Sequence, residues 1–516
     1  MSVFAGSFTR EAAAQVAGAS LPLLAQLADK SLVQRVDSAG ETLRNGAASA
    51  RTRYELQPVL RQYAAEALAQ AGETAAYQAR YAAAMTQFLA AQRADLQAAK
   101  QQEALCAITA EIENVRAAWQ WLLTHLQTAQ SGLVQLAEQV SQGIDSLFHF
   151  YDMRSWFQEG ETIFGQLAQA LSAIIPPLST PVATDDPAVA LWRLQAKAQA
   201  RQGWFVFHFG RYDESRHLLT ASLHRLQQVG AAADTIFNLN YLGPILRQLG
   251  EFAQANTYLQ AAQQLAQQHN DWLGVSTALN NLGHIALVQG DLPAVQRLCQ
   301  HALQIKRTIG DRWGMALSLG YLGRAAQYSA EYAVAQKLFA ECLTISRELD
   351  DRRRAAFALQ CLGDTAYAAG ALAEAQNHYQ ESLSLYQAIG NRSESSITLA
   401  RLGETCCTAG DRSQARQLLH SALALAWSLP STPGLLAALL GLAVLALADG
   451  QPTQARPALR FVHDHPAGSQ QQRQHAAQLL TAAGAPTTAD PAWDLATYVQ
   501  TILSEGQAVD PVAAST

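Results

Sequence analysis

The sequence predicts an all-α protein, a solenoid of helical hairpins about forty residues long, preceded by a small α+β segment. Gly residues recur at a spacing of forty residues, and the apolar residues between them follow helical spacing. Ala and Gln dominate long stretches and β-branched runs are scarce, which also favours helix. A fixed period of this length is typical of repeat proteins, in which each unit packs on its neighbours.

The apolar spacing within each unit predicts two helices. One Gly lies inside the first helix and another Gly lies at its end. A Gly inside a helix costs up to roughly 1 kcal/mol relative to Ala, so its recurrence predicts another helix packed too closely for a Cβ atom. The second Gly suits the left-handed backbone that often ends a helix. Ala443 and Ala330 each replace Gly once. The two Gly columns are Gly203, Gly243, Gly283, Gly323, Gly363 and Gly403, then Gly210, Gly250, Gly290, Gly370, Gly410 and Gly450.

A third column holds small residues in the second helix, and we expect these residues to face the same close crossing. It consists of Ser215, Ala255, Val295, Ala335, Ala375, Ala415 and Ala455. The seventh unit departs from the pattern, since Pro457 falls inside its second helix, as is usual for a repeat that caps a stack.

We expect six parts along the chain, in the following order. They are the α+β segment 1–72, helical hairpins in 73–175, a Pro-rich loop at 176–187, about seven repeats in 188–465, two closing helices in 466–505 and a flexible tail at 506–516.

The repeat columns resemble the longer form of the tetratricopeptide repeat (TPR) family over residues 188–465. The first segment resembles the winged helix of bacterial STAND-type signalling ATPases, which have a MalT-like or AfsR-like regulator layout. Its polar stretch at residues 38–50 lies between two predicted strands, "LVQRVD" and "RTRYEL", and resembles a wing. The stretches that carry this resemblance are "VFAG" at 3–6, "DKSL" at 29–32, "LRQYA" at 60–64 and "EIENVRAAWQWLL" at 111–123.

In that family a nucleotide-binding domain precedes the winged helix, and the helical arm communicates ligand occupancy to it. This sequence contains no G-x-x-x-x-G-K-[ST] loop to hold phosphates, so ATPase activity does not carry over to this chain. The first helix of a winged helix is also missing, which makes the segment a partial one. A free-standing adaptor and the sensor half of a longer regulator are both compatible with the sequence.

Composition and motifs exclude several classes of function. The net charge of −6 argues against a nucleic-acid partner. No apolar run is long enough to span a membrane and no signal peptide is visible, so we expect a cytoplasmic protein without a membrane partner. The six cysteines lack C-x-x-C spacing and are expected to be reduced, mostly buried thiols. The histidine pairs His217 with His224 and His463 with His465 lack metal-site spacing, and we expect no catalytic residue, cofactor or metal.

Candidate partner-binding residues come from positions at which the repeats differ. On the first helix of each unit, the residues two before and two after the Leu of the Leu-Gly pair lie on one face. In TPR proteins that face lines a concave groove, so the resemblance implies solvent-facing residues that are free to carry specificity. The first column is Asn240, Asn280, Gly320, Gln360 and Ala400, and the second is Pro244, His284, Arg324, Asp364 and Glu404. Basic and acidic members together favour a ligand of mixed charge.

We therefore expect a non-enzymatic interaction module, the sensor or partner-binding arm of a STAND-type signal-transduction or transcription regulator. Its partner would be a protein or peptide segment, such as an ATPase or regulator domain in cis or in trans. A small-molecule inducer is the alternative ligand, and ordinary polar surface is the alternative explanation of the two columns. A DNA-binding regulator acting through residues 1–72 and an enzyme with an unrecognised pocket are the alternatives from other classes.

Overall fold

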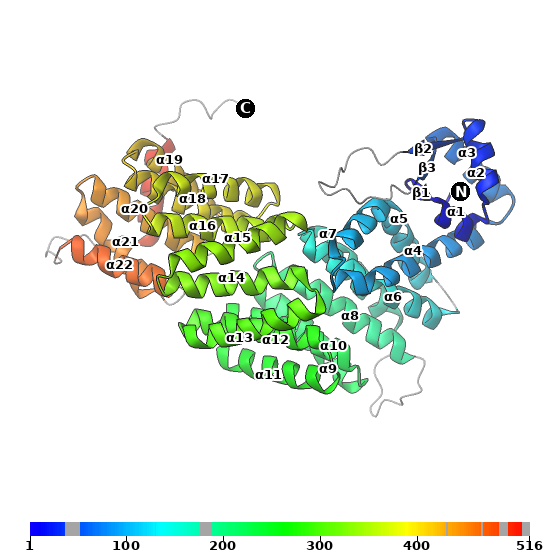
Figure 1. The fold of residues 1–516 in the computed structure, drawn as a ribbon, viewed down its shortest axis with the longest axis horizontal. Coiled ribbons are helices and arrows are strands. Elements are labelled where there is room, and N and C mark those ends of the chain that lie inside the picture. The colour runs from blue at the N-terminus through cyan, green and yellow to red at the C-terminus, as the bar shows by residue number, and fades with distance from the viewer. Residues whose placement is uncertain are drawn as a thin grey trace. The chain divides into compact units, whose positions relative to one another are not determined.

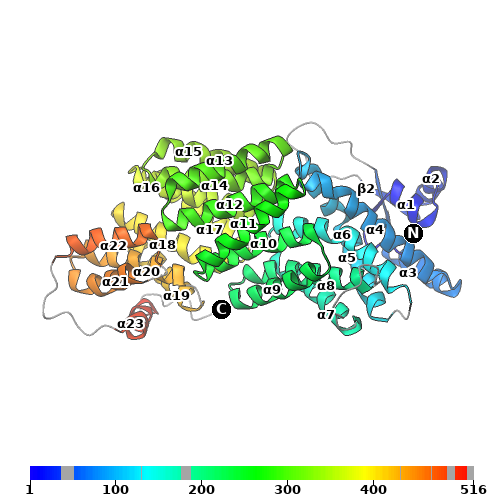
Figure 2. The same ribbon diagram turned by 90° about the horizontal axis from the view of Figure 1, so that it is seen from below.

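The computed structural model describes residues 1–36, 52–128, 131–175, 188–429, 432–465, 468–484 and 494–507. They form a helical-repeat protein with one small sheet near the N-terminus (Figures 1 and 2). The chain divides into two compact units, Met1–Asp152 with Trp156–Leu242, and Met153–Ser155 with Gly243–Thr516. We call them the N-terminal unit and the C-terminal unit. The predicted all-α repeat solenoid with a small α+β start is confirmed.

The N-terminal unit begins with a three-stranded antiparallel sheet in the order β1-β3-β2. Its strands are β1 (Phe8–Thr9), β2 (Val33–Val36) and β3 (Arg53–Leu56). Phe8 pairs with Tyr54, and Val33 pairs with Leu56; all four side chains are buried. β2 and β3 lie within the two stretches predicted as strands, whereas β1 was not predicted. The wing-like stretch 38–50 lies outside the described residues.

Three helices accompany this sheet: α1 (Arg10–Ala17), α2 (Leu21–Asp29) and α3 (Pro58–Gln70). Local chemistry determines where they begin and end. The Thr9 side chain accepts the Ala12 N–H at 3.1 Å and begins α1, which ends at Gly18 with a φ of 65°. Phe4 stacks on Phe8 with ring centroids 4.6 Å apart, so the sheet and the preceding turn share one aromatic core.

Two long hairpins and the first repeat complete most of the N-terminal unit. Their helices are α4 (Thr74–Leu96), α5 (Gln101–Thr128), α6 (Leu133–Met153), α7 (Phe157–Ile174), α8 (Ala188–Phe207) and α9 (Tyr212–Gln228). The Pro-rich stretch at 176–187 lies outside the described residues. The division between the two units falls inside α10 (Ala232–Gln248), the next helix along the chain.

The C-terminal unit continues the repeat as alternating first and second helices, followed by two closing helices. In chain order they are α11 (Phe252–Gln268), α12 (Trp272–Gln289), α13 (Leu292–Ile309), α14 (Arg312–Tyr328), α15 (Tyr332–Glu348), α16 (Arg352–Ala368), α17 (Leu372–Ala388), α18 (Arg392–Thr408), α19 (Arg412–Trp427), α20 (Thr432–Ala448), α21 (Pro452–Asp464), α22 (Gln470–Ala482) and α23 (Leu495–Gln507). The even-numbered helices from α10 to α20 are the first helices. The tail at 508–516 lies outside the described residues.

The Gly residues inside the first helices lie where each first helix crosses its own second helix. A Cβ atom at any of them would come within 2.3–2.7 Å of a side chain sixteen residues later, too close for any real contact. The predicted close crossing is therefore confirmed. The pairs are Gly203 with Leu219, Gly243 with Leu259, Gly283 with Cys299, Gly323 with Phe339, Gly363 with Tyr379 and Gly403 with Leu419. The small residues of the second helices are buried as predicted, from Ser215 to Ala455.

Replacing Gly323 with Leu is expected to destabilise the protein by about 1–3 kcal/mol, because the new side chain overlaps the Phe339 ring. The measurement is the urea midpoint of the variant against the unsubstituted chain. Ser329→Leu adds the same side chain at an exposed position of the turn after α14 and should change the midpoint little. An unchanged midpoint for Gly323→Leu would contradict the close crossing.

The turn after each first helix also follows the prediction. The Gly residues at these turns have φ between 74° and 94°, and Ala330 adopts the same left-handed region with a φ of 60°. A polar residue begins the next first helix in several units. Asp271, Asp311, Asp351 and Asn391 each accept a backbone N–H of the following turn. These caps repeat every forty residues and help to set the start of each unit.

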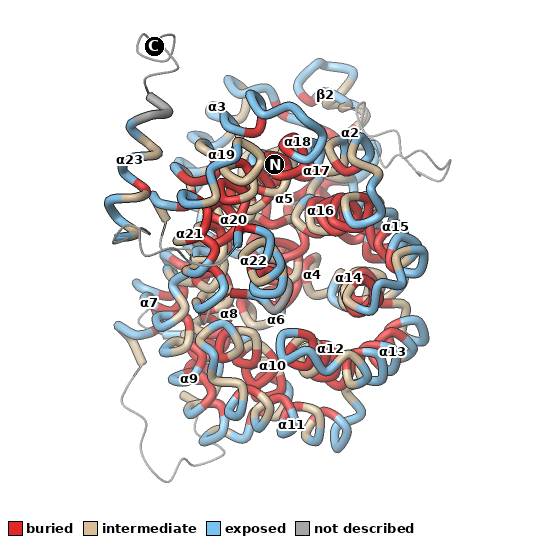
Figure 3. The backbone as a smooth tube through the Cα atoms, turned by 90° about the vertical axis from the view of Figure 1, so that its left-hand side faces the viewer, coloured by how far each residue is buried: buried red, intermediate tan, exposed pale blue. Residues whose placement is uncertain are grey.

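First helices pack directly on one another in the C-terminal unit, α12 on α14, α14 on α16 and α16 on α18. Successive second helices are further apart, because α13, α15 and α17 contact mainly first helices. The first helices therefore line the concave side of the stack, which we call the inner face. Residues on the outward side of α13 and α15 are exposed (Figure 3).

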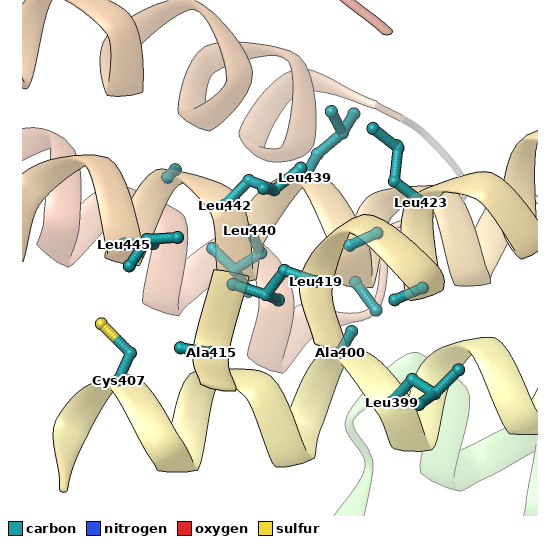
Figure 4. Packing of buried hydrophobic residues seen from close by; sticks show 14 of the residues in the cluster. Leu399, Ala400, Cys407, Ala415, Leu419, Leu423, Leu439, Leu440, Leu442 and Leu445 are labelled. Atoms are coloured by element: carbon teal, nitrogen blue, oxygen red, sulfur yellow. The ribbon is translucent and has the colours of Figure 1, made fainter. Parts of the chain in front are cut away.

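The last repeats close on a large apolar cluster. Leu399 of α18, Leu419 of α19 and Leu439, Leu440 and Leu442 of α20 are buried together (Figure 4). The apolar window of α20 is thus core. No helix in the described ranges has the length and apolar content needed to cross a bilayer. All six cysteines are free thiols and five are buried.

Candidate functional site

The first candidate column is buried between neighbouring first helices. Asn240, Asn280 and Gln360 are 3%, 0% and 7% exposed, so the prediction that they face solvent was wrong. The Asn280 Oδ1 atom accepts the Ser318 hydroxyl at 2.9 Å, and Gln360 Nε2 donates to Thr398 Oγ1 at 3.1 Å. The first helices pack so closely that Asn280 and Gln360 each form a hydrogen bond across the interface. Their role in the fold is to join successive units.

The second column divides into two kinds of position. Pro244, His284 and Arg324 are half-buried, whereas Asp364 and Glu404 are only 6% and 4% exposed. The prediction of solvent-facing carboxylates was therefore also wrong. Carboxylates without water need cationic or hydrogen-bonding partners, and the inner face supplies both.

Asp364 lies between two arginines of the neighbouring first helices. The Arg324 Nη1 atom is 3.3 Å from one carboxylate oxygen, and the Arg401 Nε atom is 3.7 Å from the other. Tyr379 donates its hydroxyl to Asp364 Oδ1 at 2.7 Å. The Asp364 carboxylate raises the pKa of the Arg401 guanidinium above its ordinary value. One carboxylate thus holds two guanidinium groups across α14, α16 and α18.

Glu404 has a separate set of partners. The Tyr367 hydroxyl donates to Glu404 Oε1 at 3.2 Å, and His475 Nδ1 from α22 lies 3.5 Å from the same oxygen. Burial raises the pKa of Tyr367 to about 12, and the Glu404 carboxylate acts in the same direction. A closing helix therefore contributes to the inner face at the sixth unit.

The other end of the inner face lacks carboxylates. The helices α12 and α14 contain no Asp or Glu, while Arg247, His284 and Arg324 lie near one another there. The His284 ring lies against Tyr321, with ring centroids 4.4 Å apart. Desolvation, together with the positive charges of Arg247 and Arg324, holds the pKa of His284 well below 6.5. An anionic ligand group would meet a favourable potential at this end.

Acid is expected to destabilise the protein through His284. Its ring stays neutral in the folded chain but takes up a proton near pH 6.5 once unfolded, so stability declines as the pH falls below about 6.5 towards the folded pKa. His284→Gln should weaken this decline. The measurement is the unfolding midpoint of both proteins at about pH 7 and about pH 5.5. Equal declines in the two proteins would contradict the low pKa of His284.

Sequence reasoning missed four members of this surface: Arg401, Tyr379, Tyr367 and His475. Arg401 directly follows the first column, and Tyr379 stands sixteen residues after Gly363, where other units have Leu, Cys or Phe. A polar hydroxyl in an otherwise apolar column was the available signal for Tyr379. Among the described residues, no group of three or more His, Cys, Asp or Glu side chains could hold a metal ion.

A second cluster joins the first segment to the helical arm within the N-terminal unit. The Asn114 side chain accepts the Gly6 N–H at 3.0 Å and donates to the Ser7 carbonyl at 2.7 Å. Beside it, Arg53 Nη1 lies 2.6 Å from the Glu111 carboxylate, which is nearly buried. The stretches "VFAG" and "EIENVRAAWQWLL", both of which resemble STAND-type proteins, thus contact each other. We call Gly6, Ser7, Arg53, Glu111 and Asn114 the joint.

The family comparison agrees with the repeat geometry. A family model for the tetratricopeptide repeat matches three overlapping windows, residues 274–348, 314–388 and 353–426. These windows cover α12 to α19, the helices that form most of the inner face. Residues 274–426 therefore contain tetratricopeptide repeats. No curated protein matches the sequence.

Several solved structures have a similar helical-repeat architecture. A Signal Transduction ATPase with Numerous Domains (STAND) protein with a tetratricopeptide repeat sensor, from Pyrococcus horikoshii, is 11% identical with a TM-score of 0.47. The match covers 98% of this chain and 64% of that one, so this chain spans less than two thirds of its length. A Rap protein complexed with Competence and Sporulation Factor is 12% identical, with a TM-score of 0.48 and coverage of 72% and 99%. NprR in complex with its cognate peptide NprX is 12% identical, with a TM-score of 0.41 and coverage of 71% and 98%. At such values these similarities carry no information on function.

Proposed function

We propose that this chain is a non-enzymatic interaction module whose inner face binds an acidic segment of a protein or peptide. The observation that carries the proposal is the sharing of Asp364 by Arg324 and Arg401. Each guanidinium keeps about a fifth of its side chain exposed, 21% and 19% respectively, while the carboxylate between them is buried. Two cations on one anion leave positive charge available to a ligand.

The charge of the surrounding helices favours the same ligand. Three of the seven Arg residues in α12, α14, α16 and α18 are paired with carboxylates of neighbouring segments (Arg312 with Glu348, Arg352 with Asp350, Arg354 with Asp351), and the helices themselves contain three acidic residues. Of these three, Asp364 and Glu404 are buried and paired, and burial raises the pKa of Glu394. A ligand on the inner face would meet guanidinium groups rather than carboxylates, so an acidic ligand replaces the mixed charge expected from the sequence.

The proposed place of this module is the sensor or partner-binding arm of a STAND-type regulator. The resemblance of residues 3–6, 29–32, 60–64 and 111–123 supports this, as does the joint, through which the first segment contacts α5. Binding on the inner face would then be transmitted towards the first segment. A regulator domain in cis or in trans would receive the signal.

The test uses fluorescein-labelled octaglutamate as the probe, with octaglutamine and octalysine as matched peptides. Octaglutamate should bind with an affinity that falls as the salt concentration rises. The substitutions Arg324→Glu and Arg401→Glu should each lower that affinity by about tenfold. Arg312→Glu makes the same charge change on α14, but Arg312 pairs with Glu348 on an exposed surface and serves as the control. Equal weakening in all three variants would contradict a site on the inner face.

Two further outcomes separate the alternatives. Stabilisation by a small anion such as citrate, with no peptide binding, would favour the small-molecule inducer. For DNA binding through residues 1–72, two arginines of the described part of this segment are already engaged: Arg53 is paired with Glu111, and Arg61 donates to the Ala5 carbonyl at 2.7 Å. These groups already have protein partners and are not directed at a phosphate backbone.

A further inference from the structure

The C-terminal unit has a groove on the opposite side of the repeats from the inner face. It has a volume of about 630 Å³ and lies over α13, α14 and α15. Leu319 and Leu322 of α14 form its floor, Leu303 and Leu338 form its walls, and Arg307 lies on its rim. We call it the outer groove. Its volume falls within the roughly 300–1,000 Å³ typical of ligand sites.

The chain itself shows what can cover such a surface. The helix α19 is the equivalent of α13 three repeats later, and Leu423, Leu439 and Leu442 stand where α13 and α14 have Leu303, Leu319 and Leu322. There α23 packs on α19 (Figures 2 and 3). Val499 of α23 is fully buried and belongs to the same apolar cluster as those three leucines.

The chemistry of α23 shows what kind of segment packs on this layer. Its apolar residues are Leu495, Tyr498, Val499, Ile502 and Leu503, which follow the i, i+3, i+4, i+7 spacing of one helical face. All five take part in the cluster with α19 and α20. A short amphipathic helix with an aliphatic stripe is therefore the occupant for which this fold provides a precedent.

We propose that the outer groove binds an amphipathic helix of a protein partner, as α19 carries α23. The partner helix places aliphatic side chains between Leu303 and Leu338, and a carboxylate near Arg307. That charge follows from α13, whose exposed side chains include Arg297 and Arg307 and which contains no acidic residue. Arg307 forms an exposed ion pair with Glu341 of α15, with 3.6 Å between Nη2 and Oε1, and the partner carboxylate replaces or shares this pair. The residues that line the outer groove do not include Arg324, Arg401 or Asp364. This proposal therefore does not depend on the proposed function.

The test uses a labelled peptide with the sequence of residues 494–507 and the full chain. The chain's own α23 keeps its place on α19, because its tether gives it a high effective concentration. Free peptide should therefore bind at the outer groove, and Leu338→Glu should weaken that binding by about tenfold or more. Arg307→Glu changes an exposed residue and should weaken it by roughly threefold.

Two matched controls accompany the test. Tyr258 stands in α11 at the position that Leu338 occupies in α15, is half-buried and lies outside the groove, so Tyr258→Glu should leave binding unchanged. A peptide carrying Val499→Asp interrupts the apolar stripe and should not bind. Thermal melting of each variant establishes that it is folded.

Three results would overturn the proposal. They are no saturable binding of the peptide, binding that Leu338→Glu and Arg307→Glu leave unchanged, and equal loss with Tyr258→Glu. A further result would replace the occupant. If sedimentation shows a dimer that Leu338→Glu converts to a monomer, a second copy of this chain covers the groove, and the partner proposal is wrong.

Discussion

Replacing Asp364 with Ala is expected to lower the free energy of unfolding by about 2–4 kcal/mol. The substitution leaves Arg324 and Arg401 without their shared counter-ion and the buried Tyr379 hydroxyl without its acceptor. Removing one partner of a buried ion pair leaves an uncompensated charge, which typically destabilises more than the intact pair stabilises. Both arginines are about a fifth exposed and can reach water, which limits the loss.

Urea unfolding of Asp364→Ala, Arg401→Ala and the double variant would measure this loss. The double variant should be more stable than the sum of the single losses predicts, because it removes both the carboxylate and one of its cations. The same carboxylate restrains the arginines proposed to meet the ligand. Octaglutamate should therefore bind Asp364→Asn more tightly than the unsubstituted chain. An unchanged midpoint for Asp364→Ala would show that the shared carboxylate does not hold the three helices together.

The repeat architecture was predictable because its causes are local and periodic. Gly283 and Gly323 recur where a first helix crosses a second helix sixteen residues later, and Gly290 recurs where the backbone turns left-handed. The close helix crossing and the left-handed turn both lie within one unit. A single stretch of forty residues therefore contains both residues of each crossing. The same reasoning could not place β1, whose two residues form a strand only because Tyr54 lies beside Phe8.

The burial of the two candidate columns on the first helices could not be predicted from the sequence of a single unit. It depends on how closely consecutive first helices pack, which the period of the repeat does not specify. The sequence does contain a signal for this burial, namely polar residues that recur as pairs in consecutive units. Asn280 with Ser318, Gln327 with Thr365 and Gln360 with Thr398 are each separated by thirty-eight residues and hydrogen-bonded. Polar pairs at this offset indicate an interface between units rather than a solvent-facing surface.

The joint shows the limit of sequence reasoning most clearly. Gly6 and Asn114 are separated by 108 residues, and no periodicity relates them. The resemblance to STAND-type proteins identified both stretches without indicating that they touch. Only the fold brings the turn before β1 onto α5, where Asn114 accepts the Gly6 N–H and donates to the Ser7 carbonyl.

Replacing Asn114 with Ala is therefore expected to destabilise the joint by about 2–4 kcal/mol. The amide is 1% exposed; it accepts the Gly6 N–H, shares the Tyr81 hydroxyl with the Asn114 backbone carbonyl, and donates to Ser7 O and Glu111 Oε2. Truncation leaves several buried polar groups without partners, and each such group typically costs about 1–3 kcal/mol.

Hydrogen exchange followed by mass spectrometry distinguishes a local effect from a global one. In Asn114→Ala, amides of residues 1–36 and 52–70 should exchange faster, while those of α12 to α19 should keep their protection, because each repeat is stabilised mainly by its neighbours. Glu113→Ala is the matched control, since its side chain is 64% exposed and its ion pair with Arg116 is on the surface. Faster exchange throughout the repeats would mean that the first segment and the solenoid unfold as one cooperative unit, and the joint could not then move independently to transmit a signal.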